Sequence, residues 1–523
     1  MRNTVFFRIS LSSLLFFMAQ AGHAALEEVS VGGHLGLRGR TYINTYTTGR
    51  AAELRGPAGW FYGRVLGTPG LTSRFDWDRR GSDSWYAETV TRLHVRARFS
   101  GGVSTMLELY NYDLWGEDFR SDYLRGADAA RFGQNDLEFL QAYVEVEDLC
   151  EQPLRLRLGR QSMLLGRGWL VGEKSTSTQY NSFDAVRLTY APLERLTVDA
   201  WAAKLNETMG PAREDAVFYG GYATWAAAPA WNLSAYYMLV HDGSRVEDTA
   251  LDPVSEGRER LLGLDQYGPT RLNTAGARFF GKPGAWDYDL EGAWQWGAAA
   301  HLGHRFQGTT LWGVYGDDDA GYGAWAADGE LGRTLDLPWQ PRVFVGGAWF
   351  DGEDRRDMSF GDWLNPFRRP QASVSFNRLF SQTYYASVIV DNTHMTNFNQ
   401  VRAGVNFTPA EQWWVQLRAA SFHAVDAFEW PAHLSLNGRK VPWLPRFGFW
   451  STPSSKDLGV TVETTVRYRY SPDLTLTLYW GHLFTGDGLG RDGNFVYLNG
   501  TEFSGGTKSH DADYITLLAE VQF

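Results

Sequence analysis

Three features are scarce in this sequence: cysteine, long apolar runs and interdomain linkers. Cys150 is the single cysteine among 523 residues, so no disulfide can form within the chain and the fold must be stable without one. No stretch after Ala24 approaches the roughly twenty consecutive apolar residues of a membrane-spanning helix, which excludes a helical membrane protein. No Pro-rich or Ser-rich segment divides the chain. We therefore expect one continuous architecture and not two or three linked domains.

Basic residues are also fewer than acidic ones. The 49 Lys and Arg residues against 60 Asp and Glu residues give a formal net charge of −11, which argues against a nucleic-acid-binding protein. Glycine, with 57 residues, and aromatic residues, at 15%, are instead abundant, and apolar residues are interleaved with polar ones. This composition suits the wall of a β-barrel.

The last ten residues, Tyr514 to Phe523, have the alternating pattern of a β-strand. Its apolar face comprises Ile515, Leu517, Ala519, Val521 and Phe523. In a soluble sheet such a strand would leave a long apolar edge open to association. In an outer-membrane barrel the last strand pairs with the first, and the apolar face meets lipid. The pattern therefore predicts a transmembrane β-barrel and disfavours a soluble β-sandwich or propeller.

The first residues predict a secretory signal peptide. Arg2 and Arg8 lie beside a short apolar run, Ile9 to Ala19, and small residues follow at Gly22-His23-Ala24. This arrangement is typical of a signal peptide that is removed after export. We expect residues 1–24 to be the signal peptide and residues 25–523 to form the barrel.

Short and long connections alternate along the chain. The short ones, rich in Gly and Pro as turns require, are Gly101-Gly102, Asp148–Pro153, Ala191–Glu194, Ala227–Ala230, Gly281–Ala285, Asp336–Pro341, Thr408–Glu411 and Ser471–Asp473. The long ones include residues up to about 84, 114–136, 160–182, 242–270, 351–397, 425–456 and 486–511. Eight short turns between nine longer loops predict an antiparallel barrel of about eighteen strands, with sixteen or twenty left open. We expect the short turns to be periplasmic and the long loops extracellular.

The polar face of several strands carries many charges. A first strand over Val29–Tyr46 and a second over Trp85–Phe99 would both have basic inward faces. A strand over Trp286–Trp296 would have an acidic one, with Asp287, Asp289 and Glu291. A strand over Leu458–Tyr470 would place Leu458, Val460 and Val462 outward, and both signs of charge inward.

A barrel of this size is too wide for side chains to fill, so it predicts an aqueous lumen unless a loop closes it. Guanidinium groups on the inward face can each hold a carboxylate, which favours an anion as the transported solute. The candidate pore-lining residues are Arg92, Arg96, Arg98, Arg155, Arg157, Arg160, Arg187, Arg402, Arg418, Glu463, Arg467 and Arg469. Alternatively, these arginines form a structural ladder, paired with inward acids such as Glu108, Glu145 and Asp199, that only neutralises the wall.

The sequence offers little for catalysis or for metal binding. His423 with Asp426, and His510 with Asp511, are neighbours in sequence and nothing more. The acidic runs at 317–319 and 351–354 read as solvated turns and not as calcium sites. We expect no enzyme, no catalytic residue, no metal and no cofactor.

Residues 154–172 and 182–190 resemble the central motif of the alginate export family of outer-membrane barrels. The resemblance lies in the Gly159-Arg160-Gln161 step, the Leu170-Val171-Gly172 step and Phe183-Asp184. It implies an eighteen-stranded barrel with an arginine-rich constriction, through which an acidic polysaccharide leaves the periplasm. Two positions depart from the family pattern: Trp169 stands where a basic residue is expected, and Ala185 where glycine is expected. The same steps could also build a plain corner braced by an Arg160–Asp184 pair.

The pattern and the resemblance together predict a porin-like channel in the outer membrane of a Gram-negative bacterium. Its passenger would be an anionic polysaccharide such as alginate or another polyuronate. Two alternatives remain: a nutrient-uptake or general porin for small anions, which would have an infolded loop narrowing the pore, and a structural or surface-binding barrel plugged by residues 351–397 and 425–456. We expect a monomer surrounded by outer-membrane lipid, working with periplasmic export machinery and binding no nucleic acid.

Overall fold

The structure, a computed structural model, describes residues 25–44, 84–115, 137–174, 180–206, 215–244, 268–305, 319–353, 374–385, 394–428, 454–489 and 511–523, with short pieces of the remaining loops. The expected signal peptide, residues 1–24, lies outside the described residues, so its cleavage stays a prediction. Among the described residues, no helix has both the length and the apolar character needed to cross a membrane.

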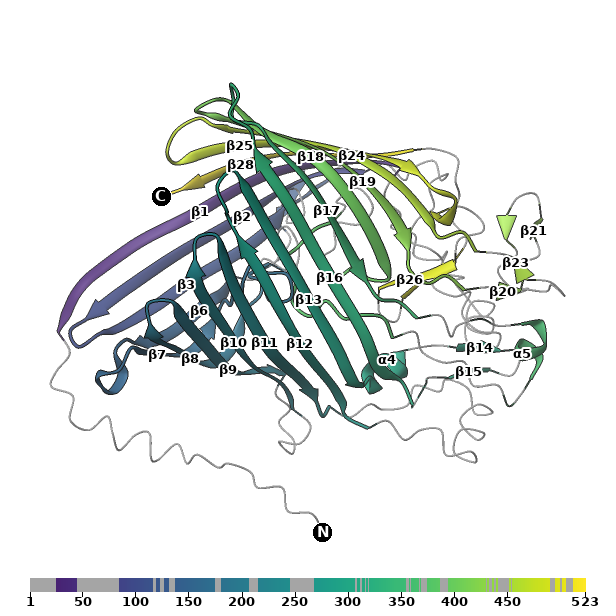
Figure 1. Cartoon of the computed structure of the whole chain (residues 1–523), viewed down its shortest axis with the longest axis horizontal. Helices are drawn as coiled ribbons and strands as arrows, with labels where there is room; N and C mark the ends of the chain where they lie inside the picture. Colours follow the sequence, from purple (N-terminus) through teal and green to yellow (C-terminus); the bar gives the residue numbers. More distant parts are fainter. Residues whose placement is uncertain are drawn as a thin grey trace, which may run out of the picture.

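Eighteen antiparallel strands form one sheet that closes on itself (Figure 1). The wall strands are β1 (Leu26–Ile43), β2 (Ser84–Phe99), β3 (Val103–Leu114), β6 (Glu138–Val146), β7 (Leu154–Gln161), β8 (Phe183–Leu193), β9 (Leu196–Asn206), β10 (Ala216–Ala228), β11 (Trp231–Asp242), β12 (Thr270–Gly281), β13 (Trp286–Ala298), β16 (Gly321–Thr334), β17 (Arg342–Phe350), β18 (Phe398–Ala410), β19 (Trp413–Ala424), β24 (Asp457–Arg469), β25 (Leu474–Thr485) and β28 (Ala512–Gln522). The predicted strand number is therefore confirmed.

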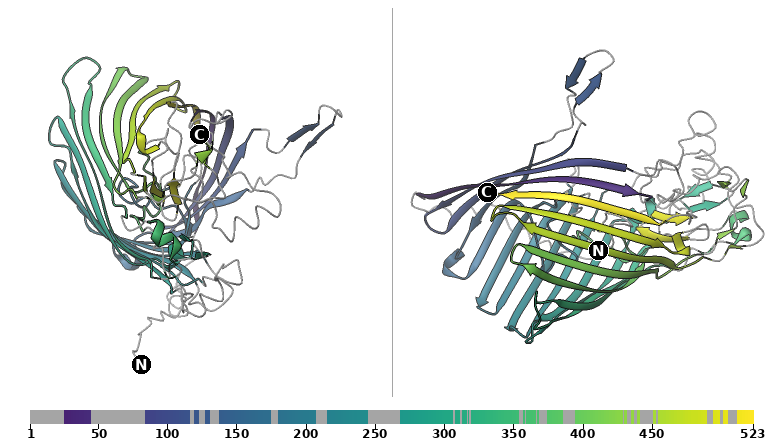
Figure 2. Two further views of the ribbon diagram at one scale, coloured as in Figure 1. Left: turned by 90° about the vertical axis from the view of Figure 1, so that its right-hand side faces the viewer. Right: turned by 90° about the horizontal axis from the view of Figure 1, so that it is seen from above.

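The ends of the chain close the barrel. β28 pairs with β1 from His34↔Gln522 to Ile43↔Asp513, and each other wall strand pairs with the next one along the sequence. Short turns lie at one end of the barrel and long connections at the other (Figures 1 and 2). Closure pairs the backbone groups that an open edge would expose to lipid.

The long connections contain short elements of their own. These are β4 (Phe119–Asp122), β5 (Ala127–Ala130), α4 (Ala300–Arg305), β14 (Gly308–Thr310), β15 (Gly313–Tyr315), α5 (Phe360–Leu364), β20 (Trp430–Pro431), β21 (Ser435–Leu436), β22 (Arg439–Lys440), β23 (Ser451–Thr452), a 3-10 turn at Asp487–Leu489, β26 (Asn494–Leu498) and β27 (Thr501–Ser504). A further 3-10 turn, Leu149–Glu151, belongs to the short connection between β6 and β7.

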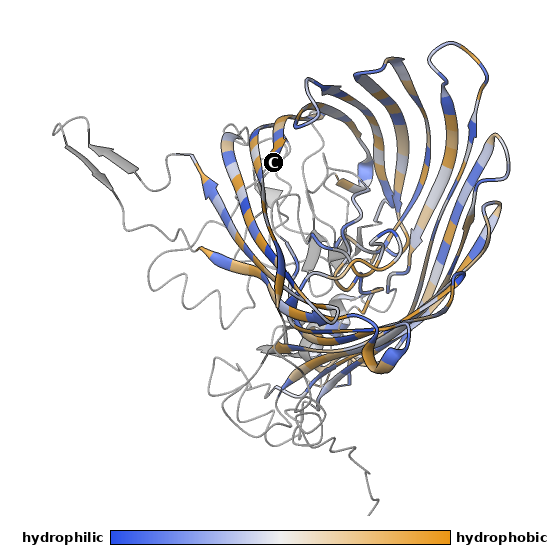
Figure 3. Cartoon of the chain, turned by 90° about the vertical axis from the view of Figure 1, so that its left-hand side faces the viewer, coloured by the Kyte–Doolittle hydropathy of each residue, from blue (hydrophilic) through white to orange (hydrophobic). Residues whose placement is uncertain are grey.

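The side chains alternate as the sequence predicts, with apolar residues outward and polar residues inward. Leu290 and Trp294 of β13 are about half exposed on the outer surface, whereas Glu291 between them is buried at 7%. The same alternation of hydrophobic and hydrophilic residues follows the wall strands in Figure 3. Leucine and tryptophan side chains that are exposed in this way face the acyl chains of a membrane.

One expected orientation is wrong. Leu458 was expected outward with Val460, but its side chain is fully buried inside the barrel. The register between β19 and β24 shifts at this point, so that His423 pairs with Asp457 and Leu458 is an extra residue. Gly459 has a φ of +112°, and a bulge of this kind turns the preceding side chain to the other face.

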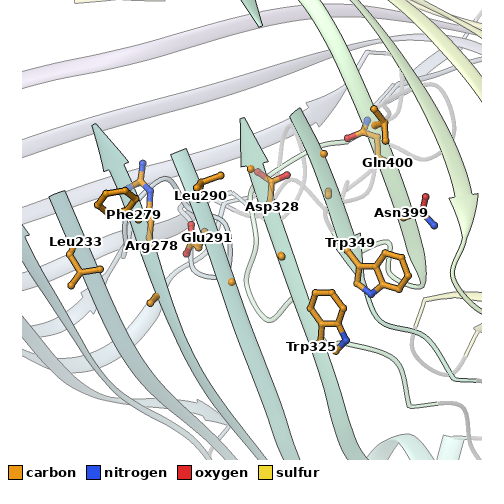
Figure 4. A pocket seen from close by; sticks show the side chains of 17 residues that line it. Leu233, Arg278, Phe279, Leu290, Glu291, Trp325, Asp328, Trp349, Asn399 and Gln400 are labelled. Atoms are coloured by element: carbon orange, nitrogen blue, oxygen red, sulfur yellow. The ribbon is translucent and has the colours of Figure 1, made fainter. Parts of the chain in front are cut away.

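The outer wall is hollowed over β11 to β18. Small residues there, including Gly292 and Gly329, line a groove with a volume of about 700 Å³. Trp325 and Trp349 stand beside it (Figure 4), with ring centroids 5.5 Å apart and the planes nearly parallel. The outward Leu290 and Val401 also line the groove, which places it on the lipid-facing side of the wall.

Candidate functional site: the charged lumen

Two segments of the long connections lie inside the barrel (Figure 3). We call residues 162–174, between β7 and β8, lumenal loop 1, and residues 374–385, between β17 and β18, lumenal loop 2. They are joined by backbone hydrogen bonds from Gly172 N to Phe380 O and from Phe380 N to Leu170 O, both 2.9 Å. The two loops therefore form one structure that occupies part of the lumen.

Trp169 anchors lumenal loop 1. Its side chain is fully buried, with its ring 5.9 Å from that of Phe350 on β17 and 6.3 Å from that of Phe376 in lumenal loop 2. Its indole N–H donates a hydrogen bond of 3.0 Å to the hydroxyl of Tyr385. Trp169 thus packs the two lumenal loops together. It does so at the position where the family pattern has a basic residue.

The connection from β7 to β8 crosses the whole lumen. At one side, Arg167 contacts carboxylates of β13 and β16. At the other side, the ring of Tyr180 lies 4.8 Å from the guanidinium of Arg92 on β2 and 5.4 Å from the ring of Tyr110 on β3. β3 is the third and β16 the twelfth of the eighteen wall strands, so these two contacts lie on opposite walls.

Arg378 holds lumenal loop 2 in shape. Its side chain, 1% exposed, donates hydrogen bonds to the carbonyl of Met395 at 3.2 Å, to the hydroxyl of Ser381 at 3.0 Å and to the carbonyl of Thr383. The guanidinium lies 4.9 Å from the ring centroid of Phe350. Burial lowers the pKa of Arg378 to about 10, so the group remains a cation at neutral pH.

The densest group of predicted pore residues surrounds Glu145 on β6. Arg157 lies 2.5 Å, Arg96 3.6 Å and Arg155 3.9 Å from its carboxylate oxygens. The Glu145 side chain is 2% exposed, whereas those of Arg96 and Arg155 are 40% and 42% exposed. We call these four residues the Glu145 cluster; it presents three guanidinium groups to the lumen around one buried carboxylate.

Six other predicted arginines are paired with an acidic residue, and Arg402 also contacts a second one, Glu330, at 3.2 Å. The closest contacts are Arg92 to Glu108 at 2.7 Å, Arg187 to Asp199 at 2.9 Å, Arg402 to Asp328 at 3.0 Å, Arg98 to Glu28 at 3.3 Å, Arg160 to Asp184 at 3.4 Å, and Arg418 to Glu463. These pairs have the geometry of the structural ladder that the sequence left as the alternative.

Two predicted pore residues differ from the rest. Arg467 and Arg469, at the short-turn end of β24, are exposed and form no ion pair with a described carboxylate. The guanidinium of Arg467 lies 5.1 Å from the ring centroid of Trp414 on β19. Both guanidinium groups therefore leave their positive charge available to a solute that enters from the short-turn end.

The sequence did not predict Arg167 of lumenal loop 1 as a functional residue, nor several acidic partners of the wall arginines. Glu88 on β2 is buried and accepts hydrogen bonds from Arg40 at 2.7 Å and from Arg38. Alternation could have placed Glu88 inward, because it has the same parity as Arg92. Arg167 has no such signal, since it lies in an irregular segment whose path depends on tertiary packing.

A closed barrel with an apolar outer face, a charged inner face and short turns at one end defines the class of this protein. It is an outer-membrane channel of a Gram-negative bacterium, with periplasmic turns and extracellular loops. The family model for alginate export matches residues 78–496, and the chain therefore belongs to the alginate export family.

Comparison with solved structures finds similar chains. The chain is similar to Pseudomonas aeruginosa OccK8 (OprE), with 11% identity, a TM-score of 0.50, and coverage of 95% of this chain and 99% of that one. It is also similar to Pseudomonas aeruginosa OpdO, with 11% identity, a TM-score of 0.47, and coverage of 96% and 98%. At 11% identity, the likeness to OccK8 shows the fold alone. Comparison with curated proteins gives no match.

Proposed function

We propose that this channel passes an anionic polysaccharide, such as alginate or another polyuronate, through its arginine-lined lumen. The observation that carries the proposal is the Glu145 cluster, in which three arginines share one carboxylate. Two positive charges remain uncompensated there, and guanidinium groups bind carboxylates in a two-pronged geometry. Passage would be passive, with electrostatic guidance and no chemistry.

The position of these charges fits entry from the periplasm. Arg96 and Arg155 lie near the short-turn ends of β2 and β7, and Arg467 and Arg469 near that of β24. A solute entering from the periplasm would meet these cations before it reached the lumenal loops. Periplasmic export machinery would supply the driving force, since a passive channel supplies none.

A second candidate is an uptake porin for small anions. The observation that favours it is the pair of lumenal loops, because they narrow the lumen in the way expected of such a porin. Their buried core, with Trp169 and Phe376 fully enclosed, is packed too tightly for a solute to pass through the loops themselves. A solute must pass through the part of the lumen that the two loops leave open. The width of this passage decides whether the channel admits an extended polymer or only a small acid.

The experiment is single-channel recording of the refolded mature barrel in a planar bilayer, with oligouronates of increasing length. Block that tightens as the oligomer lengthens supports the polysaccharide, because successive carboxylates meet successive arginines. Block by monomeric acids alone supports the small-anion porin. A cation-selective reversal potential contradicts both.

The role of the Glu145 cluster is tested by the double variant Arg155→Gln/Arg157→Gln. We expect weaker oligouronate block, while folding is checked by heat-modifiable migration on gels. The matched control is Arg195→Gln/Arg333→Gln. Arg195 is an exposed turn residue bonded to the carbonyl of Ala227, and Arg333 lies against the outward Trp286. Equal block in both double variants would remove the cluster from the mechanism.

A further inference from the structure

The wall opposite the arginine-rich strands carries a group of three carboxylates. Asp289 and Glu291 belong to β13 and Asp328 to β16, and all three lie on inward positions. The side chains of Glu291 and Asp328 are 5% and 1% exposed. Figure 4 shows Glu291 and Asp328 on neighbouring strands. We call these three residues the acidic wall.

Arg167 of lumenal loop 1 reaches this wall from across the lumen. One terminal nitrogen lies 2.7 Å from Asp328 Oδ1, and Nε lies 3.2 Å from Glu291 Oε2 and 4.0 Å from Asp289 Oδ1. Burial alone would lower the pKa of Arg167, but the neighbouring carboxylates, with Asp328 foremost, outweigh it and raise the pKa. The guanidinium is therefore a permanent cation.

The loop is shaped to hold Arg167 there. Gly166 and Gly168 on either side have φ values of +58° and +77°, which a residue with a side chain adopts only with strain. A Cβ at Gly166 would lie 2.6 Å from the hydroxyl of Tyr222, and one at Gly168 would lie 2.5 Å from Gln382. The turn is thus fitted between β10 and lumenal loop 2, with Arg167 projecting to the acidic wall.

Arg167 supplies the cation that pairs with Glu291 in the acidic wall. Asp289 is paired with Arg278 at 2.9 Å, and Asp328 with Arg402 at 3.0 Å. Glu291 receives a hydrogen bond of 3.2 Å from Tyr236, and among the described residues its ion pair is with Arg167. Arg402 is also shared with Glu330 of β16 at 3.2 Å, so it does not neutralise Asp328 alone. Without Arg167, Glu291 loses its ion pair and the wall carries one more uncompensated buried negative charge.

We infer that Arg167 is a selectivity-determining residue, which masks the acidic wall and couples the position of lumenal loop 1 to the charge preference of the channel. With the loop docked, the Glu145 cluster together with Arg467 and Arg469 gives the lumen an excess of positive charge, and anions pass. With the loop displaced, the acidic wall attracts cations. The inference rests on the proposed anion passage, but it concerns a different residue and a different wall.

The test is the reversal potential of Arg167→Gln in a salt gradient, compared with the wild-type channel. Fields in a narrow charged passage change local ion concentrations by about tenfold or more, so we expect the anion-to-cation permeability ratio to fall on the order of tenfold. Arg167→Lys, which keeps the charge, should recover much of the loss. Arg333→Gln on the outer surface, with the same loss of charge, should leave the ratio unchanged.

A double-mutant cycle with Glu291→Gln separates masking from a simple loss of positive charge. If Arg167 acts through Glu291, the effects of the two substitutions on the reversal potential are coupled and not additive. Additive effects, or an Arg167→Gln channel as anion-selective as wild type, overturn the inference. A wild-type channel without anion preference refutes the proposed function and not this inference. In that case, a shift of the reversal potential toward cation selectivity in Arg167→Gln would still support masking of the acidic wall.

Discussion

Replacing Trp169 by alanine should release the lumenal loops from the wall. The tryptophan is fully buried, and truncating a buried aromatic side chain costs about 3–5 kcal/mol. The hydroxyl of Tyr385 also loses the indole N–H that donates to it at 3.0 Å. Since about 1.4 kcal/mol corresponds to a factor of ten, a loss of about 4 kcal/mol lowers the ratio of docked to undocked loops about a thousandfold.

Single-channel recording measures this release directly. We expect Trp169→Ala to have a larger mean conductance and more open-channel noise, because the loops then spend time away from the wall and leave a wider passage. Trp325→Ala is the matched control, since Trp325 is 41% exposed on the outer wall and touches neither loop. A Trp169→Ala channel with the conductance and noise of the wild type would refute the assignment of Trp169 as the anchor.

Two predictions concern the stability of the barrel, measured as the urea midpoint of unfolding in detergent. Gly159→Ala should lower the free energy of unfolding by roughly 1–3 kcal/mol, because Gly159 has a φ of +122° and a Cβ there would lie 2.4 Å from the carbonyl oxygen of Ala142. The control Gly323→Ala, with open space around the position, should change the free energy of unfolding little. Equal urea midpoints for the two variants would contradict the backbone strain at Gly159. Arg418→Leu should cost about 3–5 kcal/mol, since it leaves Glu463, whose side chain is 4% exposed, buried without a cation. Exposed Arg469→Leu should stay within about 0.5 kcal/mol, and a similar loss in both variants would argue against the Arg418–Glu463 pair.

The wall of the barrel could be predicted from the sequence because alternation is a local signal. Each side chain of a strand points opposite to its neighbours, so a row such as Arg92, Arg96 and Arg98 is placed on one face by counting alone. The turn positions follow from Gly and Pro in the same way. The error at Leu458 shows the limit of counting, because a single bulge at Gly459 reverses the parity before it.

The lumenal loops could not be predicted, because nothing local states where they pack. Residues 162–174 have no period, and the partners of Trp169 are about two hundred positions away in the sequence at Phe376 and Tyr385. The motif around Gly159-Arg160-Gln161 marked the right region. Within it, however, the residue that reaches the opposite wall is Arg167, which no strand pattern places.

Charge preference in this lumen depends on how arginines and carboxylates are matched and not on the number of arginines. In pairs such as Arg187–Asp199 and Arg92–Glu108, the fields of the two opposite charges largely cancel at a passing solute. Salt screens what remains of the field beyond about 8–10 Å. The Glu145 cluster, with three guanidinium groups on one carboxylate, does not cancel. The acidic wall keeps the cation at Glu291 and Asp328 only while Arg167 is docked. The positive charge along the passage is therefore fixed at the Glu145 cluster and at Arg467 and Arg469, whereas the cation at the acidic wall moves with lumenal loop 1. A movement of this loop would change the selectivity as well as the width of the channel.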